Sequence, residues 1–384
     1  MTNDARRPLC VLFVVTEDWY FMSHRLGLAQ RARAAGWRVV VVARESDRAA
    51  AIRAQGLEFI ALPVERGLTS PWRDLLAVLS LRRVLYEVAP DLVHLVSLKP
   101  ILLGGLALRF YPRPCAALLA FTGLGYIFSS RAGLARLLKP VITRLLAAVA
   151  RQHGAWVLAQ NEEDLALLRA NGIAAAARAS IIAGAGLALA EFPATPLPPR
   201  ARALIILPAR VLRDKGVYEF VAAAARVRAL RPDVRFALVG AHDRANPGAV
   251  AARDLEDWVA SGAIEWWGHR HDMAAVYADA YIVCLPSYRE GLPRALLEAG
   301  ACARPLLATD VPGCREICID GESGLRVPPR NVEALAQAML RMLDDASLVS
   351  RCAGGARAHV EAHYTLEQIA AQTLALYQTL LALR

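Results

Sequence analysis

The sequence lacks the features of a disulfide-rich or zinc-binding protein. Its 384 residues include seven cysteines, which are scattered and form no C-x-x-C pair. The closest spacing, Cys314-x-x-x-Cys318, has no second cysteine pair or histidine cluster beside it, so a zinc site is not indicated. An odd, scattered set of cysteines is typical of reduced thiols. We therefore expect free thiols and a cytosolic location.

Long apolar runs are absent as well. No uninterrupted apolar run reaches the roughly 18 residues of a membrane-spanning helix. The apolar run at 9–15 is only strand-length and follows a polar start, so no secretory signal is expected. We expect a chain that is soluble or lies on a membrane without crossing it. The longest apolar region, 101–128, is interrupted by Arg109, Pro112, Arg113 and Pro114.

Acidic residues are missing between Asp91 and Glu162, where eight lysines and arginines occur. Residues 1–190 hold 23 Lys and Arg against 13 Asp and Glu, whereas residues 191–384 hold 22 of each. The net charge of +10 therefore belongs to the first half of the chain. Such a surface attracts anionic phosphates or lipid headgroups, although a basic solubilising surface explains the same imbalance.

The sequence does contain a repeated alternation of strand-like apolar runs and amphipathic helical patterns, which predicts parallel sheets covered by helices on both faces. Its length suits two domains. One predicted helix, 70–87, has apolar residues at Leu75, Leu79, Leu81, Val84 and Leu85. The other elements predicted in the first half are strands at 9–15, 38–43, 59–62, 92–96, 117–120 and 156–159, and a helix at 22–35.

The proline-rich segment EFPATPLPPR (191–200) marks a linker, after which the pattern starts again. We predict an α/β protein with two doubly wound, Rossmann-like domains at 1–190 and 203–363, joined by a linker at 191–202. Ligands of such sheets bind at the carboxyl ends of the strands, so the cleft between the domains is the expected site. The second half has predicted strands at 203–207, 235–239, 264–266, 281–285 and 305–308, and helices at 217–230, 249–261, 293–301 and 314–317.

A further predicted helix, 134–149, has a continuous apolar face, from which Arg136 and Lys139 point away. That face either packs on the sheet or lies on an anionic membrane, and different turns can do each. Pro140 is expected to kink this helix.

Two carboxylates, Glu290 and Glu298, lie eight positions apart around the end of a predicted strand. Between them Gly291 lets a ligand approach the backbone, and Pro293 suits the start of a helix whose first amides form an anion site. A carboxylate accepts hydrogen bonds from two hydroxyls, as a sugar or ribose diol requires. An anion site flanked by two such acids is what a nucleotide-diphosphate sugar would need.

Arg210 and Lys215 share the loop that leaves the first strand of the second domain. Two cations at the carboxyl end of a strand can grip a diphosphate without a metal. The chain contains no Asp-x-Asp motif, so a metal-bridged diphosphate is not indicated, and we expect no cofactor.

With these features the sequence resembles glycosyltransferase family 4, whose members are retaining enzymes of the GT-B fold. The Arg210/Lys215 loop, the E-x7-E pair and the run at 310–329 resemble its donor half. VGAHDRANPG (239–248), WWGHRHDM (266–273), HLVSLKP (94–100) and FTGLGYIF (121–128) resemble a bacterial subgroup that extends polyprenyl-diphosphate-linked glycans, including diacetylbacillosamine-type N-acetylgalactosaminyltransferases.

The resemblance implies a role for each matching position. Arg210 and Lys215 would hold the donor diphosphate, Glu298 the ribose hydroxyls and Glu290 the hexose hydroxyls. Residues 364–384 would form a C-terminal helix that crosses back to the first domain. Retention without an obvious protein nucleophile implies front-face attack with the leaving phosphate as base. Further donor contacts are expected at Gly240, His269, Gly291, Leu292 and Pro293.

The sequence departs from the family in two places. Leu187-Ala188 replaces a common Val-Asp, with little expected loss, and the first loop (16–29) has no Gly-Gly pair. Contacts there must come from other groups, for which Ser23, His24 and Arg25 are the candidates, and His24 is equally compatible with a structural histidine. The loop 121–128 is either a binding loop or only a tight turn. The expected acceptor-side residues are His24, Arg25, Lys99, Thr122, Gly123 and Tyr126.

These features together predict a retaining glycosyltransferase on the inner face of the cytoplasmic membrane. Its substrates would be a nucleotide sugar, such as a UDP-N-acetylhexosamine, and a lipid-linked or lipopolysaccharide-type acceptor. A UDP-sugar 2-epimerase shares the fold but leaves the basic first half unexplained. A non-catalytic basic binder leaves the paired glutamates unexplained, and the basic stretch lacks the aromatic interleaving of a nucleic-acid module.

Overall fold

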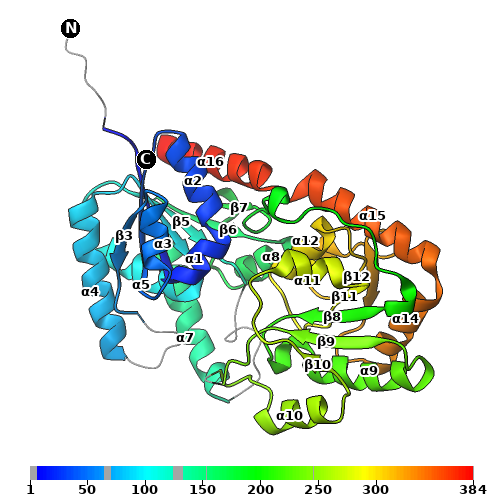
Figure 1. The fold of residues 1–384 in the computed structure, drawn as a ribbon. Helices are drawn as coiled ribbons and strands as arrows, with labels where there is room; N and C mark the ends of the chain where they lie inside the picture. The colour runs from blue at the N-terminus through cyan, green and yellow to red at the C-terminus, as the bar shows by residue number, and fades with distance from the viewer. Residues whose placement is uncertain (1–6, 65–70, 124–132, 153, 245, 384) are drawn as a thin grey trace. The chain divides into compact units, whose positions relative to one another are not determined.

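The computed structural model describes residues 7–64, 71–123, 133–152, 154–244 and 246–383. The chain divides into two compact units, one comprising residues 1–186 and 366–384 and the other residues 187–365. Each unit is a parallel sheet with helices on both faces, so the predicted fold class is confirmed (Figure 1).

The first unit contains a seven-stranded sheet in the order β3-β2-β1-β4-β5-β6-β7. The strands are β1 (Cys10–Glu17), β2 (Arg38–Arg44), β3 (Glu58–Ala61), β4 (Leu92–Val96), β5 (Ala116–Ala120), β6 (Ala155–Ala159) and β7 (Ala179–Ile181). The helices are α1 (Asp18–His24), α2 (Leu26–Ala34), α3 (Ala49–Ala54), α4 (Pro71–Val88), α5 (Leu98–Arg109), α7 (Gly133–Ala150), α8 (Glu162–Ala170) and α16 (Leu366–Ala382).

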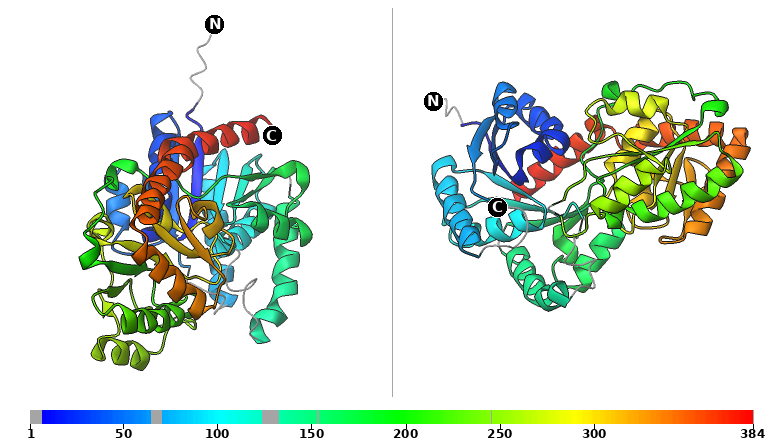
Figure 2. Two further views of the ribbon diagram at one scale, coloured as in Figure 1. Left: turned by 90° about the vertical axis from the view of Figure 1, so that its right-hand side faces the viewer. Right: turned by 60° about the horizontal axis from the view of Figure 1, so that its bottom comes forward.

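The two faces of this sheet are covered by different helices. One buried cluster combines side chains of α4, α5, α7 and α8 with one face of the strands. The other combines α1, α2, α3 and α16 with the opposite face, and α16 packs against α2 although it lies at the far end of the chain. Figure 2 shows the same division, with the cyan and teal helices on one side of the sheet and the dark blue and red helices on the other.

The second unit contains a six-stranded sheet in the order β10-β9-β8-β11-β12-β13. Its strands are β8 (Leu204–Pro208), β9 (Arg235–Val239), β10 (Glu265–Trp266), β11 (Ile282–Leu285), β12 (Leu306–Thr309) and β13 (Gly324–Val327). Its helices are α9 (Val217–Leu230), α10 (Ala252–Ala260), α11 (Met273–Asp279), α12 (Arg294–Ala301), α13 (Cys314–Ile317), α14 (Val332–Asp344) and α15 (Ala346–His363).

Most predicted elements occur within three residues of their predicted bounds, but the single helix expected at 22–35 is wrong. The chain forms a helix directly after β1 and breaks it at Arg25, whose φ and ψ of −127° and −16° interrupt the helical path. The buried carboxylate of Asp18 fixes this early start, because it accepts hydrogen bonds from the backbone amides of Trp19 and Ser46 at 2.7 and 2.6 Å.

Helix α7 uses its apolar band in two ways. Ile142, Leu146 and Val149 are buried in the core, whereas Val141 and Leu145 are half exposed. The band is therefore wider than the face that packs on the sheet. Pro140 lies inside the helix.

Candidate active site

The strand order of the second sheet reverses between β8 and β11, which are hydrogen-bonded neighbours although three helices and two strands separate them in sequence. The connections leaving these two strands diverge to opposite faces of the sheet, and such a reversal is where open parallel sheets bind their ligands. The loop after β8 carries Arg210 and Lys215, and the loop after β11 carries Glu290. The topology therefore brings together two segments that the sequence singled out separately.

Lys215 and Glu290 form an ion pair at this point. The Nζ of Lys215 lies 2.5 Å from Oε1 of Glu290, and both side chains are largely buried. The hydroxyl of Ser287, itself fully buried, donates to the same carboxylate oxygen at 2.7 Å. Burial lowers the pKa of Lys215, but the nearby carboxylates, Glu290 above all and also Asp214, together outweigh it, so the pKa lies above its ordinary value. Lys215 is consequently a fixed cation.

Close backbone contacts hold the two loops against each other. Gly216 follows Lys215 with a positive φ of 71°, and a Cβ there would lie 2.1 Å from the carbonyl oxygen of Pro286. Gly313, ahead of α13, approaches the Glu290 loop in the same way, since its Cβ would lie 2.3 Å from the carbonyl oxygen of Gly291. A side chain at Gly216 would force the Lys215 and Glu290 segments apart, and one at Gly313 would push the Glu290 loop away from α13.

Glu298 lies in the second turn of α12, where two side chains orient its carboxylate. Arg294 places Nε 2.6 Å from Oε1, and the buried phenol of Tyr277 donates to Oε2 at 3.0 Å. Burial and the neighbouring carboxylate raise the pKa of Tyr277 well above its usual range, so it remains a donor. The helix begins at Arg294 with Pro293 as its N-cap, one residue later than predicted.

The remaining donor-side predictions lie on neighbouring loops of the same unit. Arg210 is half exposed, 3.5 Å from a carboxylate oxygen of Asp243 in the loop after β9, and near enough to Lys215 to oppose its protonation. Gly240 lets the loops after β8 and β9 touch, because a Cβ there would lie 1.9 Å from the carbonyl oxygen of Ala209. His269 is exposed and stacks edge-on against His271. Leu292 is half-buried.

In the first unit, three expected acceptor-side residues lie at the carboxyl ends of β4 and β5. The hydroxyls of Thr122 and Ser97 lie 2.9 Å apart, and Ser97 adopts a positive φ of 77°, rare for a residue with a side chain. Gly123 follows with φ of 130°. Lys99, in the first turn of α5, is paired with Asp74 of α4 at 2.6 Å. Ser97 was not singled out from the sequence, since nothing local signals its backbone conformation.

His24 and Arg25 end α1, but only His24 is partly exposed. The His24 ring stacks on Tyr20 with centroids 4.3 Å apart, and its Nδ1 lies 2.7 Å from the Ser23 hydroxyl. Arg25 is only 4% exposed, so it belongs to the interior of the unit. Burial lowers the pKa of His94, and the positive charge of Arg25 lowers it further. An acceptor contact of Arg25 stays a prediction. Tyr126 lies outside the described residues.

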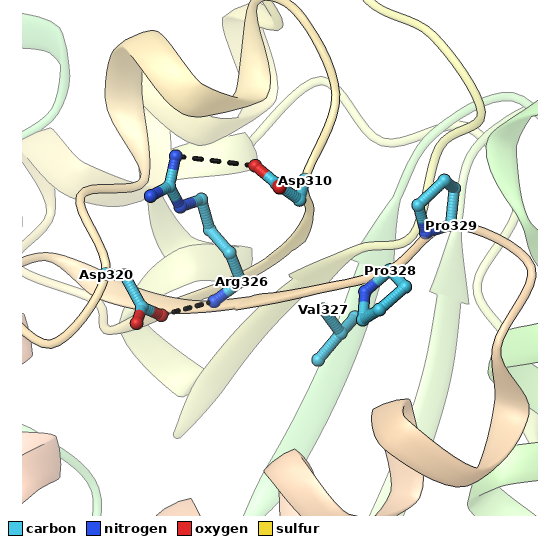
Figure 3. A pocket seen from close by; sticks show the side chains of 6 residues that line it. All are labelled: Asp310, Asp320, Arg326, Val327, Pro328 and Pro329. Atoms are coloured by element: carbon cyan, nitrogen blue, oxygen red, sulfur yellow. Dashed lines mark hydrogen bonds and ion pairs between the residues drawn. The ribbon is translucent and has the colours of Figure 1, made fainter.

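A hollow of about 290 Å³ lies beside β12 and the edge strand β13 of the second sheet (Figure 3). Arg326 crosses it, with its guanidinium 3.4 Å from Asp310 and its backbone amide donating to Asp320 at 2.8 Å. A diphosphate would meet two carboxylates and one arginine here, whereas the loop after β8 offers two cations, Arg210 and Lys215. The Lys215 loop is therefore the candidate phosphate site. The hollow is lined by Asp310, Asp320, Arg326, Val327, Pro328 and Pro329.

Two family models match the chain, one in each unit. Residues 202–345 match the model described as glycosyl transferases group 1, and residues 10–152 match the model described as glycosyl transferase 4-like. The first match contains Arg210, Lys215, Glu290 and Glu298. The chain belongs to glycosyltransferase family 4. It is a hexosyltransferase with the GT-B fold.

Similar proteins agree with this assignment. This glycosyltransferase is 26% identical over 322 residues to the N,N'-diacetylbacillosaminyl-diphospho-undecaprenol alpha-1,3-N-acetylgalactosaminyltransferase of Campylobacter jejuni, covering 81% of this chain and 83% of that protein. Its fold matches a sucrose-phosphate synthase from Thermosynechococcus elongatus with a TM-score of 0.82 and 21% identity, over 98% and 100% of the two chains. It also matches Anabaena HepE, solved with UDP and glucose, with a TM-score of 0.77 and 16% identity, over 96% and 99%.

The described residues contain neither a membrane-spanning helix nor a cluster of metal-ligand side chains. Over those ranges, no helix is both long and apolar enough to span a bilayer. In the same part of the chain, no three histidine, cysteine, aspartate or glutamate side chains cluster as metal ligands would.

Proposed function

We propose that this glycosyltransferase acts with retention, moving an N-acetylhexosamine from a UDP donor to a polyprenyl-diphosphate-linked saccharide or a related lipopolysaccharide or capsule precursor. The observation that carries the proposal is the Lys215–Glu290 pair at the strand-order reversal of the second sheet, with Glu298 on the following helix. A fixed cation and two oriented carboxylates are the groups that a nucleotide-diphosphate sugar requires.

Lys215 supplies charge to the departing diphosphate. Its ammonium has three donors, of which Glu290 uses one, so two remain for phosphate oxygens. Arg210, on the same loop, adds a second cation from the solvent side. Charge that is already in position stabilises the developing negative charge without reorganisation. The reaction therefore needs no metal in this proposal.

The two glutamates orient the donor. The bonds from Lys215 and Ser287 both end on Oε1 of Glu290, so, as far as the described residues show, Oε2 can accept a hexose hydroxyl. Glu298, held by Arg294 and Tyr277, accepts the ribose hydroxyls. The bond from the anomeric carbon to the phosphate oxygen breaks, the acceptor oxygen bonds to that carbon on the same face, and the acceptor proton passes to the leaving phosphate.

The acceptor and the location are inferred from the relative and from charge. The Campylobacter jejuni protein is named for a diphospho-undecaprenol substrate, and it aligns over most of both chains. The excess of positive charge in the first half of this chain suits an acceptor that carries a diphosphate in an anionic membrane. We accordingly propose that the enzyme works peripherally at the inner face of the cytoplasmic membrane.

A thermal-shift panel in EDTA tests the donor site. UDP, GDP, ADP and CMP are compared with UDP-GlcNAc, UDP-GalNAc and UDP-glucose, and we expect stabilisation by UDP and by one UDP sugar without added metal. Lys215→Ala should abolish the shift. Arg226→Ala, which removes an exposed cation of α9 paired with Glu333, should keep it. No shift with any nucleotide, or a shift that requires a divalent cation, would contradict the proposal.

The donor so identified then tests the transfer. UDP release should depend on a polyprenyl-diphosphate-linked saccharide, and the new linkage should have the anomeric configuration of the donor, as measured by NMR. An inverted linkage would exclude retention and leave the donor site intact. A donor epimerised without transfer would instead indicate epimerase chemistry.

A further inference from the structure

Helix α4 has an exposed apolar stripe in addition to the apolar face that packs on the sheet. Trp72, Leu75, Leu76 and Leu79 follow the i, i+3, i+4, i+7 spacing of one helical face, and all four are exposed, Trp72 to 77% and Leu76 to 57%. The core of the unit takes the opposite side of the helix, through Ala77, Leu81, Val84, Leu85 and Val88. The exposed stripe therefore has no role in holding α4 on the sheet.

This arrangement is not the incidental exposure of single apolar residues. Scattered surface leucines are ordinary, but a continuous apolar stripe on a helix marks a contact surface. At the rise of an α-helix the four side chains cover roughly 10 Å along the axis. Val141 and Leu145 on α7, in the same helix layer, are half exposed as well.

The charge of this layer indicates what the stripe contacts. Helices α4, α5 and α7 together carry eight lysines and arginines against two acids, although one of the eight, Lys99, is largely buried against Asp74. Helices α1, α2, α3 and α16 on the other face carry three cations and two acids. Helix α8, at the far end of the same layer, carries three acids in its first turn, which confines the basic surface to α4, α5 and α7. Arg82 and Arg83 lie exposed on α4, near the apolar stripe.

We propose that the α4 stripe, comprising Trp72, Leu75, Leu76 and Leu79, inserts into an anionic phospholipid bilayer. An amphipathic helix lying in the membrane plane combines tryptophan and leucine on one side with flanking arginines that reach the lipid phosphates. The inference deepens the proposed function, because it gives the surface through which the first unit would meet a lipid-linked acceptor.

Vesicle binding by the full chain tests the stripe. Co-sedimentation is measured with phosphatidylcholine vesicles and with vesicles in which about a third of the lipid is phosphatidylglycerol. We expect binding to the anionic vesicles only, reduced by at least about tenfold in the double variant Leu76→Ser with Leu79→Ser. Leu230→Ser, at a leucine of α9 that is 69% exposed, is the matched control and should bind like the wild type.

Three results would overturn the inference. The first is a wild type that anionic vesicles do not retain, and the second is a double variant that binds as well as the control. The third is a dimer, detected by light scattering, that the double variant dissociates, which would make the stripe an interface between two copies. UDP titration by calorimetry separates this inference from the donor site, because the double variant should bind UDP like the wild type. Vesicle binding without UDP binding would contradict the proposed function and still support the assignment of the α4 stripe as a membrane-binding surface.

Discussion

The phenol of Tyr277 donates a 3.0 Å hydrogen bond to Oε2 of Glu298 from the preceding helix, α11. Tyr277 is completely buried, and Arg294 holds the other carboxylate oxygen, so the plane of the Glu298 carboxylate is fixed before any ligand arrives. If Glu298 binds the ribose of the donor, Tyr277 is the residue that orients it.

Tyr277→Phe should therefore weaken binding of ribonucleotides more than binding of deoxyribonucleotides. Losing a hydrogen bond to a charged group costs about 1.5–3 kcal/mol, so we expect the Kd for UDP to rise at least tenfold and that for 2'-deoxy-UDP to change little. Calorimetric titration measures both. Tyr218→Phe removes a comparable tyrosine–carboxylate bond, to Asp254, and should alter neither Kd. An equal loss for both nucleotides would assign Tyr277 to packing alone.

Lys215→Ala should lower kcat/KM, because the transition state loses about 2–4 kcal/mol of stabilisation, the range for removing a charge-stabilising donor. It should also lower the melting temperature, because Glu290 is left largely buried without its cation. The double variant Lys215→Met with Glu290→Gln removes both charges. It should regain most of the stability and none of the activity, as measured by thermal unfolding and by UDP release. Recovery of both would mean that the pair is structural.

Glu290→Gln should make donor binding sensitive to pH. The carboxylate holds the pKa of Lys215 up against the effect of burial. In the variant burial and the Arg210 charge lower that pKa, opposed only by Asp214, so the pKa should fall. The wild-type affinity for UDP should then persist as pH rises from about 7 to about 9, whereas the variant loses affinity as its ammonium deprotonates. Titration of UDP itself is common to both proteins and cancels in the comparison.

Ser287→Ala is the control for that experiment. It removes the hydroxyl bond to Oε1 of Glu290 but keeps the ion pair, so its pH profile should follow the wild type. Parallel profiles for all three proteins would show that Glu290 does not set the charge of Lys215.

Gly216→Ala should disrupt the backbone contact that holds the Lys215 and Glu290 loops against each other. Its φ of 71° costs an alanine about 1–2 kcal/mol, and its Cβ would also meet the Pro286 carbonyl at 2.1 Å. Gly262 has nearly the same φ, 66°, but its Cβ would meet nothing within 4 Å, so Gly262→Ala isolates the backbone cost. We expect Gly216→Ala to lower the melting temperature at least twice as far as Gly262→Ala does. Each kcal/mol of lost stability lowers the melting temperature by about 2–4 °C. Equal shifts in melting temperature would show that the two loops move apart at little cost to accommodate the added methyl group.

Local patterns were sufficient to predict most of the fold. The helices at 217–230 and 314–317 and the strand at 235–239 have their predicted bounds, because apolar periodicity and flanking turn residues are local signals. The helix at 22–35 was mispredicted because the chain turns into a helix already at Asp18, whose buried carboxylate accepts a bond from the amide of Ser46, a residue on a different segment. Strand β13 was not identified as a strand, since GLRV is short and lies inside a recognisable motif.

The sequence by itself determined that the candidate residues Arg210, Lys215 and Glu290 follow strand ends and that Glu298 lies on the next helix, because strand and helix signals are local. Only the tertiary structure decided that Lys215 and Glu290, 75 positions apart, would meet, and that Tyr277 would orient Glu298. The same holds for α4. Its leucines predict a helix, but periodicity cannot say that Leu81 and Leu85 enter the core while Leu75 and Leu79 remain exposed. Burial depends on which neighbours cover a face, and neighbours are set by the whole chain.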